Sequence, residues 1–226
     1  MKEIMAWPGE KEAWDILSDL DSKDINTNAK ALFNSYDSTY ELTCFGQDIC
    51  ISLKDRNVFT KSILGKLLVN TLGEYSRFSI LRYLINAIDI PLSGQLVRPS
   101  DLPGGDIFMR GTHVLPLDKM AEYFADNFNE FLIIGKSLGG SQLDYGDMSL
   151  KIFPFPRVPV VLIIWSGDEE FPPKSSLLLD SSCVSYLSTD IIWSTSMMAV
   201  EMILMNTKAY NKPIQATGRS VAALTR

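Results

Sequence analysis

Three consecutive carboxylates, Asp168, Glu169 and Glu170, follow an almost continuous apolar run at residues 158–165. In extended backbone, Asp168 and Glu170 point to one side of the chain and Glu169 points to the other. Two carboxylates on one side, with Asp180 supplying further oxygen, would offer the ligands that Mg²⁺ and Ca²⁺ prefer. The spacing therefore predicts a hard-cation site with Asp168 and Glu170 as the metal ligands.

The same acidic segment is also typical of a solvated turn. In that interpretation Asp168 or Glu170 caps a backbone amide or pairs with a cation, and Phe171 packs under the sheet. The arginines considered for such a pair are Arg110 and Arg157. Short acidic side chains in turns commonly accept hydrogen bonds from nearby backbone amides. Both interpretations therefore stay open.

His113 is the only histidine in the chain. Any imidazole acid or base, and any axial imidazole ligand to a tetrapyrrole or corrinoid cofactor, must therefore be this residue. A divalent-metal hydrolase or lyase would use His113 as the base beside a metal held by Asp168 and Glu170. The sequence places no nucleophile beside His113, so a catalytic triad is not indicated. The structural alternative is a hydrogen-bonded histidine in a loop.

The three cysteines, Cys44, Cys50 and Cys183, do not have the spacing of metal ligands. Because the sequence contains no Cys-x-x-Cys pair, this chain alone builds neither a zinc ribbon nor an iron–sulfur cluster. The first residues carry early acidic side chains and no apolar core, which is not the pattern of a secretory signal. We expect reduced thiols in a cytoplasmic protein.

The 226 residues carry a formal net charge of −6, and 46% of them are hydrophobic. Residues 207–226 contain four basic and no acidic side chains, so removing their +4 leaves −10 for residues 1–206. An acidic body opposes binding to nucleic acid or to an anionic membrane. No apolar run reaches the roughly 20 residues that cross a bilayer. We expect one domain over residues 1–206, a disordered basic tail over 207–226, and no nucleic-acid or membrane partner.

Hydrophobic periodicity places the elements that must position these side chains. Alternation with period two predicts strands at residues 40–45, 49–53 and 56–60. Two further strands are expected at residues 148–153 and 158–165, the latter from its nearly continuous apolar run. Helical spacing predicts helices within the first 40 residues as far as Tyr36, and at residues 78–88, 117–125, 128–138 and 189–205. Asn127 and Glu130 resemble a capping box. The segregated order predicts an α+β fold with a mostly antiparallel sheet and helices packed against it.

The last predicted helix, residues 189–205, is apolar nearly all round and contains four methionines. A helix of this kind must be buried on every side. The chain can bury it in its own core, or two copies can bury it between them. A homodimer through this helix is therefore the partner that the sequence predicts.

The most distinctive local pattern is PRVPV at residues 156–160, leading to WSGDEEFP at residues 165–172. Shorter motifs accompany it at residues 102–105 (LPGG), 110–113 (RGTH), 138–140 (LGG), 179–182 (LDSS) and 186–190 (YLSTD). With these motifs the chain resembles the domain of unknown function 3786 family from about residue 40 to residue 193. The resemblance implies an uncharacterised protein of anaerobic bacteria and archaea without an established reaction. Some family members look joined to a cysteine-rich segment suited to an iron–sulfur cluster, whereas this chain has three scattered cysteines.

The function that these observations favour is a non-catalytic accessory module that binds a small ligand or a partner. Its pocket would lie between the irregular connection of residues 91–116 and the turn of residues 167–173, because a long structureless connection is uncommon unless it is functional. The candidate binding residues are Arg110, His113, Arg157, Trp165, Asp168, Glu170 and Asp180. The metal-dependent hydrolase or lyase and the tetrapyrrole- or corrinoid-associated protein are the alternatives. The enzyme requires His113 to lie near Asp168 and Glu170.

Overall fold

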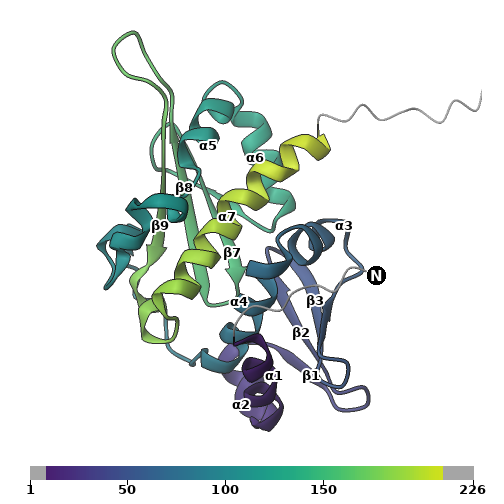
Figure 1. Cartoon of the computed structure of the whole chain (residues 1–226). Helices are drawn as coiled ribbons and strands as arrows, with labels where there is room; N and C mark the ends of the chain where they lie inside the picture. Colours follow the sequence, from purple (N-terminus) through teal and green to yellow (C-terminus); the bar gives the residue numbers. More distant parts are fainter. Residues whose placement is uncertain (1–8, 211–226) are drawn as a thin grey trace, which may run out of the picture.

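Two antiparallel sheets form the framework of the computed structural model, which describes residues 9–210 except for the side chains of Glu74, Met109 and residues 208–210 (Figure 1). The first sheet has the strand order β1-β2-β3-β4, and the second has the order β5-β9-β8-β7-β6. The strands of the first sheet are β1 (Leu32–Asn34), β2 (Thr39–Cys44), β3 (Gln47–Ser52) and β4 (Asn57–Phe59). Those of the second are β5 (Leu96–Val97), β6 (Ser141–Leu143), β7 (Met148–Phe155), β8 (Val158–Trp165) and β9 (Lys174–Asp180).

Helices accompany each sheet. Those before the second sheet are α1 (Glu10–Asp19), α2 (Ser22–Ala29), α3 (Ile63–Lys66) and α4 (Gly73–Asn86), and a π-helical segment (Leu67–Thr71) separates α3 from α4. The later helices are α5 (Leu117–Phe124), α6 (Phe128–Ser137) and α7 (Thr189–Tyr210). The helices α1 and α2 pack on α4, whereas α5, α6 and α7 pack on the second sheet. This arrangement confirms the predicted α+β fold with antiparallel strands and packed helices.

The chain leaves helical structure earlier than the sequence predicts. The helix α2 ends at Lys30, whose φ of 55° lies in the left-handed region. Phe33 then lies in β1 and pairs with Tyr40 of β2, with ring centroids 4.7 Å apart. The predicted helical segment as far as Tyr36 is therefore wrong after Lys30, because pairing between strands outweighs the local helical spacing.

The apolar run before the acidic turn forms β8, the central strand of the second sheet. Its apolar side chains at Val158 and at residues 160–164 are at most 4% exposed. Since neighbouring side chains in a strand point to opposite faces, this burial confirms a strand covered on both faces. The neighbouring strand β9 was not predicted, because its first residues, Lys174 to Ser176, are polar.

The helix α6 begins at Phe128, as predicted, but without a capping box. Nδ2 of Asn127 donates to the carbonyl oxygen of Tyr123 at 2.7 Å, and its side chain caps no amide of α6. The carboxylate of Glu130 accepts a hydrogen bond from the Tyr123 hydroxyl at 3.1 Å. The predicted capping box is wrong because Tyr123 of α5 binds both of the side chains that it requires.

The last helix, α7, is covered by the elements of its own chain. It packs against α4, α5, α6 and β7, and its residues 198–200, 202 and 203 are at most 1% exposed. A second subunit is not needed to bury these residues, so a homodimer through α7 stays a prediction. The helix continues to Tyr210, which includes the first four residues of the predicted tail, and the rest of that tail lies outside the described residues. None of the helices formed by residues 9–210 is long and apolar enough to span a membrane.

The two sheets meet where two glycines pack backbone against backbone. Gly46, with φ 67°, closes the turn between β2 and β3, and Gly139, with φ 70°, follows α6. A Cβ atom on either glycine would lie 3.0 Å from a backbone atom of the other. Next to this contact, the amide of Phe45 donates to the carbonyl oxygen of Phe153 at 2.8 Å. Close approach and positive φ together require glycine at both positions.

Candidate ligand-binding site

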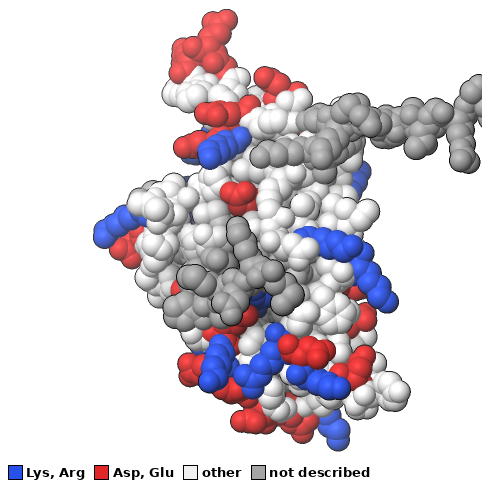
Figure 2. Space-filling view, turned by 45° about the vertical axis from the view of Figure 1, so that its right-hand side comes forward, with Lys and Arg blue, Asp and Glu red and all other residues white. Residues whose placement is uncertain are grey.

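The acidic turn lies at the tip of the β8–β9 hairpin, which projects from the body of the molecule (Figure 1). Acidic side chains gather at this tip, at the top of Figure 2. Oδ1 of Asp168 accepts hydrogen bonds from the amides of Glu170 and Phe171, at 2.8 and 2.7 Å. Phe171 is 67% exposed, which contradicts the expectation that it packs under the sheet. Asp168 therefore closes an exposed turn.

Arg157 is buried and binds two segments that are distant in sequence, and it does not pair with the acidic turn. It lies between β7 and β8 and is 8% exposed. Its guanidinium donates to the carbonyl oxygens of Thr27, Asn28 and Ile90 and pairs with the carboxylate of Asp89. These bonds join the last turn of α2 to the segment after α4, so the side chain has a structural role.

Asp180, the last residue of β9, anchors the segment that leads into β5. Its Oδ1 accepts hydrogen bonds from the amide and hydroxyl groups of both Ser93 and Ser182, and its Oδ2 accepts from the amide of Gly94 at 2.8 Å. Burial on its own would raise the pKa of this carboxyl, but the hydrogen bonds from Ser182 and Ser93 outweigh burial and lower the pKa to about 2. The carboxylate therefore has a structural role, because it binds the backbone amides of Ser93, Gly94 and Ser182.

The remaining candidates from the sequence lie apart from one another. Arg110 is exposed and pairs with Asp106 at 3.5 Å. Trp165 is half-buried at the end of β8, opposite Lys174 of β9. Within residues 9–210, no group of three histidine, cysteine, aspartate or glutamate side chains is placed to hold a metal ion. Among the described residues, the predicted metal ligands Asp168 and Glu170 therefore have no third histidine, cysteine, aspartate or glutamate placed to complete a metal site.

His113 lies in a small pocket beside the start of α7. Its carbonyl oxygen accepts a hydrogen bond from Nε1 of Trp193 at 2.7 Å, and the two rings meet edge to face at 5.1 Å. The pocket has a volume of about 110 Å³. Its other lining residues are Tyr75, Phe78, Ser79, Ile107, Asp190, Ile191 and Ser194. Small-molecule sites usually have about 300–1,000 Å³, so this pocket as it stands is too small for a corrinoid or tetrapyrrole.

The structure does not bring His113 and the acidic turn together. The tip of the β8–β9 hairpin projects beyond the Trp165–Lys174 pair, whereas α7 follows Asp180 at the other end of β9, so the two lie toward opposite ends of the second sheet (Figure 1). The connection of residues 91–116 does line a pocket, but α4 and α7 complete it, and none of residues 167–173 takes part. A mechanism that joins His113 with Asp168 and Glu170 therefore has no support in the geometry.

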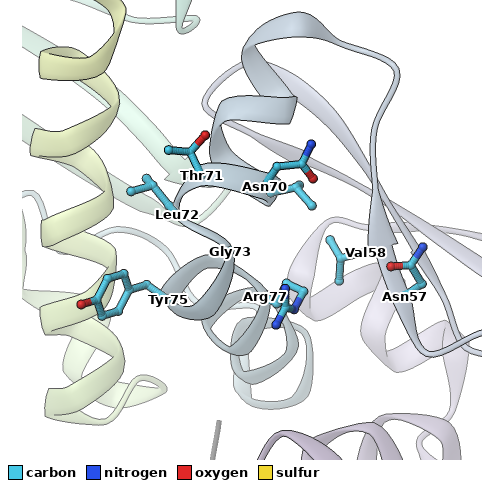
Figure 3. A pocket seen from close by; sticks show the side chains of 9 residues that line it. Asn57, Val58, Asn70, Thr71, Leu72, Gly73, Tyr75 and Arg77 are labelled. Atoms are coloured by element: carbon cyan, nitrogen blue, oxygen red, sulfur yellow. The ribbon is translucent and has the colours of Figure 1, made fainter. Parts of the chain in front are cut away.

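A larger cavity, of about 510 Å³, lies between β4 and the start of α4 (Figure 3). We call it the Arg77 pocket. Its lining residues are Asn57, Val58, Val69, Asn70, Thr71, Leu72, Gly73, Tyr75 and Arg77. In Figure 3, Arg77 and Val58 face each other across the space between α4 and β4, whereas Tyr75 points toward α7. Tyr75 also lines the pocket of His113, so the two pockets are neighbours.

The π-helical segment shapes the upper wall of the Arg77 pocket. The amide of Leu72 donates to the carbonyl oxygen of Leu67, five residues earlier, at 3.2 Å. Leu68 and Val69 are buried in the core, while Asn70 and Thr71 stay exposed at the mouth of the pocket. Such widened turns are rare and are frequent at functional sites. Here the widened turn places the polar residues Asn70 and Thr71 at the cavity.

Arg77 supplies the charge in the pocket, and Glu10 holds it in place. Nε of Arg77 lies 3.4 Å from Oε1 of Glu10, and the two side chains are only 12% and 9% exposed. Within the described part of the chain, neither Nη atom of Arg77 has a hydrogen-bond partner, and Oε2 of Glu10 has none either. A Cβ atom at Gly73 would lie 3.3 Å from Nη1. The absence of a side chain at Gly73 therefore leaves the guanidinium accessible from that side.

The model of the domain of unknown function 3786 family matches residues 21–202 of this chain. The chain belongs to this family. The matched segment includes every residue that lines the Arg77 pocket, whereas Glu10 lies before the segment. Searches of the curated proteins and of the solved structures found no match to the chain.

Three of the residues in the motifs that carry the resemblance to this family have structural roles. Gly139 makes the joint between the sheets, Arg157 ties α2 to the segment after α4, and Asp180 anchors the segment before β5. The residues of the Arg77 pocket were not identified from the sequence. The only signal was the sequence Asn70 to Gly73, where polar and small residues interrupt a helical stretch.

Proposed function

We propose that this member of the domain of unknown function 3786 family is a non-catalytic module that binds a small molecule in the Arg77 pocket. The observation that carries the proposal is a cavity of about 510 Å³ whose lining combines apolar and polar side chains. This volume is within the range of about 300–1,000 Å³ that is usual for small-molecule sites. The apolar side chains include Val58 and Leu72, and the polar groups are those of Asn57, Asn70 and Arg77.

The chemistry of the lining supports binding over catalysis. The nine lining residues offer amide, hydroxyl and guanidinium groups, but no carboxylate, imidazole or thiol. Amides and hydroxyls donate and accept hydrogen bonds, and a guanidinium donates only. General acid–base and nucleophilic catalysis ordinarily need a group that takes up or gives up a proton near neutral pH. The lining is thus suited to recognising a ligand rather than to transforming it.

The position of the pocket connects ligand binding to the rest of the fold. Asn57 and Val58 belong to β4, whereas Tyr75 and Arg77 belong to α4, which packs on α7. A ligand that contacts both walls would connect β4 of the first sheet to α4 and, through α4, to α7. Since a ligand that binds only the folded state stabilises it, we expect occupancy to raise the melting temperature of the whole protein.

Nuclear magnetic resonance of the full chain, labelled with ¹⁵N, tests the proposal. A panel of small polar molecules is titrated in, and shifted amides are expected to cluster at residues 57–58 and 69–77. Asn70→Ala should weaken the binding, because it removes an amide from the mouth of the pocket. Asn129→Ala is the matched control, since Asn129 lines a different depression beside α6. Shifts that cluster elsewhere, or equal loss in both variants, would contradict the proposal.

A further inference from the structure

We infer that the ligand of the Arg77 pocket carries an oxyanion, a carboxylate or a phosphate, which the guanidinium of Arg77 binds through its two Nη atoms. This inference rests on the proposed function and adds the chemical class of the ligand.

The orientation of the guanidinium is fixed from one edge. Nε of Arg77 is directed at Oε1 of Glu10, 3.4 Å away, so the edge that carries Nη1 and Nη2 remains for another acceptor. A guanidinium presents its donors in a planar fork that matches the paired oxygens of carboxylate and phosphate groups. Because the side chain is only 12% exposed, it loses little further freedom when an anion binds.

The charges around Arg77 favour an anion over a cation. None of the nine lining residues carries a negative charge. The carboxylate of Glu10 meets the Nε edge and is itself 9% exposed, so it does not line the cavity. A cation that entered the pocket would therefore meet the positive side of the Glu10–Arg77 pair.

The mouth of the pocket offers neutral hydrogen-bond donors for the other oxygens of an anion. Asn57, Asn70 and Thr71 are exposed and line the cavity together with Arg77. Their amide and hydroxyl groups donate without adding charge. One guanidinium beside neutral polar groups suits a compact anion, whereas the polyanionic backbone of a nucleic acid needs an extended basic face.

The test compares anions with neutral molecules on the full chain at constant ionic strength. Isothermal titration uses inorganic phosphate and pyrophosphate as one arm, succinate and citrate as a second, and glucose and glycerol as a third. Each titration is repeated with Arg77→Lys, which keeps the charge but loses the fork. Arg56→Lys is the matched control, because Arg56 pairs with Asp15 on the surface and does not line the pocket.

We expect one anion arm to bind, with affinity at least tenfold weaker in Arg77→Lys and unchanged in Arg56→Lys. Binding of phosphates alone or of carboxylates alone identifies the source of the oxyanion. Anion binding that is equal in both variants would overturn the inference. Binding of a neutral molecule that shifts the amides of the pocket and is insensitive to Arg77→Lys would also overturn it, while leaving the proposed function intact. No binding from any arm at the pocket would overturn both.

If Arg77→Lys loses its folded circular dichroism spectrum, the double variant Glu10→Gln/Arg77→Gln replaces it. This variant removes the buried carboxylate together with its cation, so no unpaired charge is left inside. It is expected to fold and to lose the anion binding of the wild-type protein. A folded double variant that still binds the anion at wild-type affinity would overturn the inference.

Discussion

Arg77 in α4 and Glu10 at the start of α1 form an ion pair across 67 residues of sequence, with Nε 3.4 Å from Oε1. Both side chains are nearly buried, at 12% and 9% exposure. The pair joins the first helix to the wall of the Arg77 pocket. The same contact therefore serves the stability of the fold and the orientation of the charge in the proposed site.

Removing one partner of this pair should cost more than removing both. Arg77→Gln leaves the carboxylate of Glu10 buried without its cation, and we expect a loss of about 1–3 kcal/mol in the free energy of unfolding. The double variant Glu10→Gln/Arg77→Gln should recover at least half of this loss, as measured by urea unfolding. Arg56→Gln, which breaks an exposed pair with Asp15, should cost less than about 1 kcal/mol. Strictly additive losses in the double variant would contradict this account.

The glycine joint between the sheets should tolerate no side chain. Gly139→Ala places a Cβ atom 3.0 Å from Cα of Gly46 at a φ of 70°, so strain and crowding act together. We expect a loss of at least about 2 kcal/mol in the free energy of unfolding. Gly94→Ala is the control, because Gly94 has φ 73° and no atom within 4 Å of the added Cβ. Its loss should stay near 1 kcal/mol; equal losses would show that crowding at the joint is unimportant.

Asp180 should make stability depend on pH in the acid range. Its pKa of about 2 in the folded protein lies below the ordinary value of 3.8 for an aspartate, so the unfolded chain binds the proton more readily. The stability that Asp180 contributes is complete above about pH 4 and is lost as the pH falls toward 2. We expect the difference in unfolding free energy between wild type and Asp180→Asn to shrink by about 2 kcal/mol from pH 5 to pH 2. A difference that is constant over this range would contradict the assignment.

The hydrogen bond between Trp193 and His113 should hold the connection before α5. Trp193→Phe removes the donor to the carbonyl oxygen of His113, which lies 2.7 Å away. We expect a loss of about 1 kcal/mol in unfolding free energy and faster amide hydrogen exchange at residues 105–113. Trp165→Phe, at the far end of β8, is the control and should leave exchange in this segment unchanged. Unaltered exchange in Trp193→Phe would mean that other contacts hold the segment.

The sequence predicted those parts of the fold in which one period dominates. The central strand β8 is a run of adjacent apolar residues, and in β2 buried and more exposed residues alternate, so local pattern and tertiary packing agree. The strand β9 was missed because Lys174 to Ser176 give no apolar alternation. The prediction of a helix as far as Tyr36 was wrong after Lys30, because Phe33 pairs with Tyr40 of a strand that lies later in the chain.

The candidate site was harder to predict, because its parts are brought together only by the fold. Asn57, Asn70 and Arg77 lie on three different elements, and Glu10 comes from a fourth. A π-helical turn has no hydrophobic period of its own that would mark it in a sequence. Conversely, the polar residues that stood out by type, such as Arg157 and Asp180, are buried and hydrogen-bonded because an unpaired buried charge is costly.

The side-chain resonances of Arg77 show whether this pocket binds a small ligand. In the full chain labelled with ¹⁵N-arginine, the Nε signal of Arg77 is assigned by its absence from Arg77→Lys and followed during titration with pyrophosphate and with citrate. We predict a saturable shift of this signal with one of these anions, together with the amides of residues 69–73, while the Arg56 signal stays in place. An Arg77 signal that does not move while the protein binds the anion elsewhere, or that moves no more than the Arg56 signal, would contradict the account.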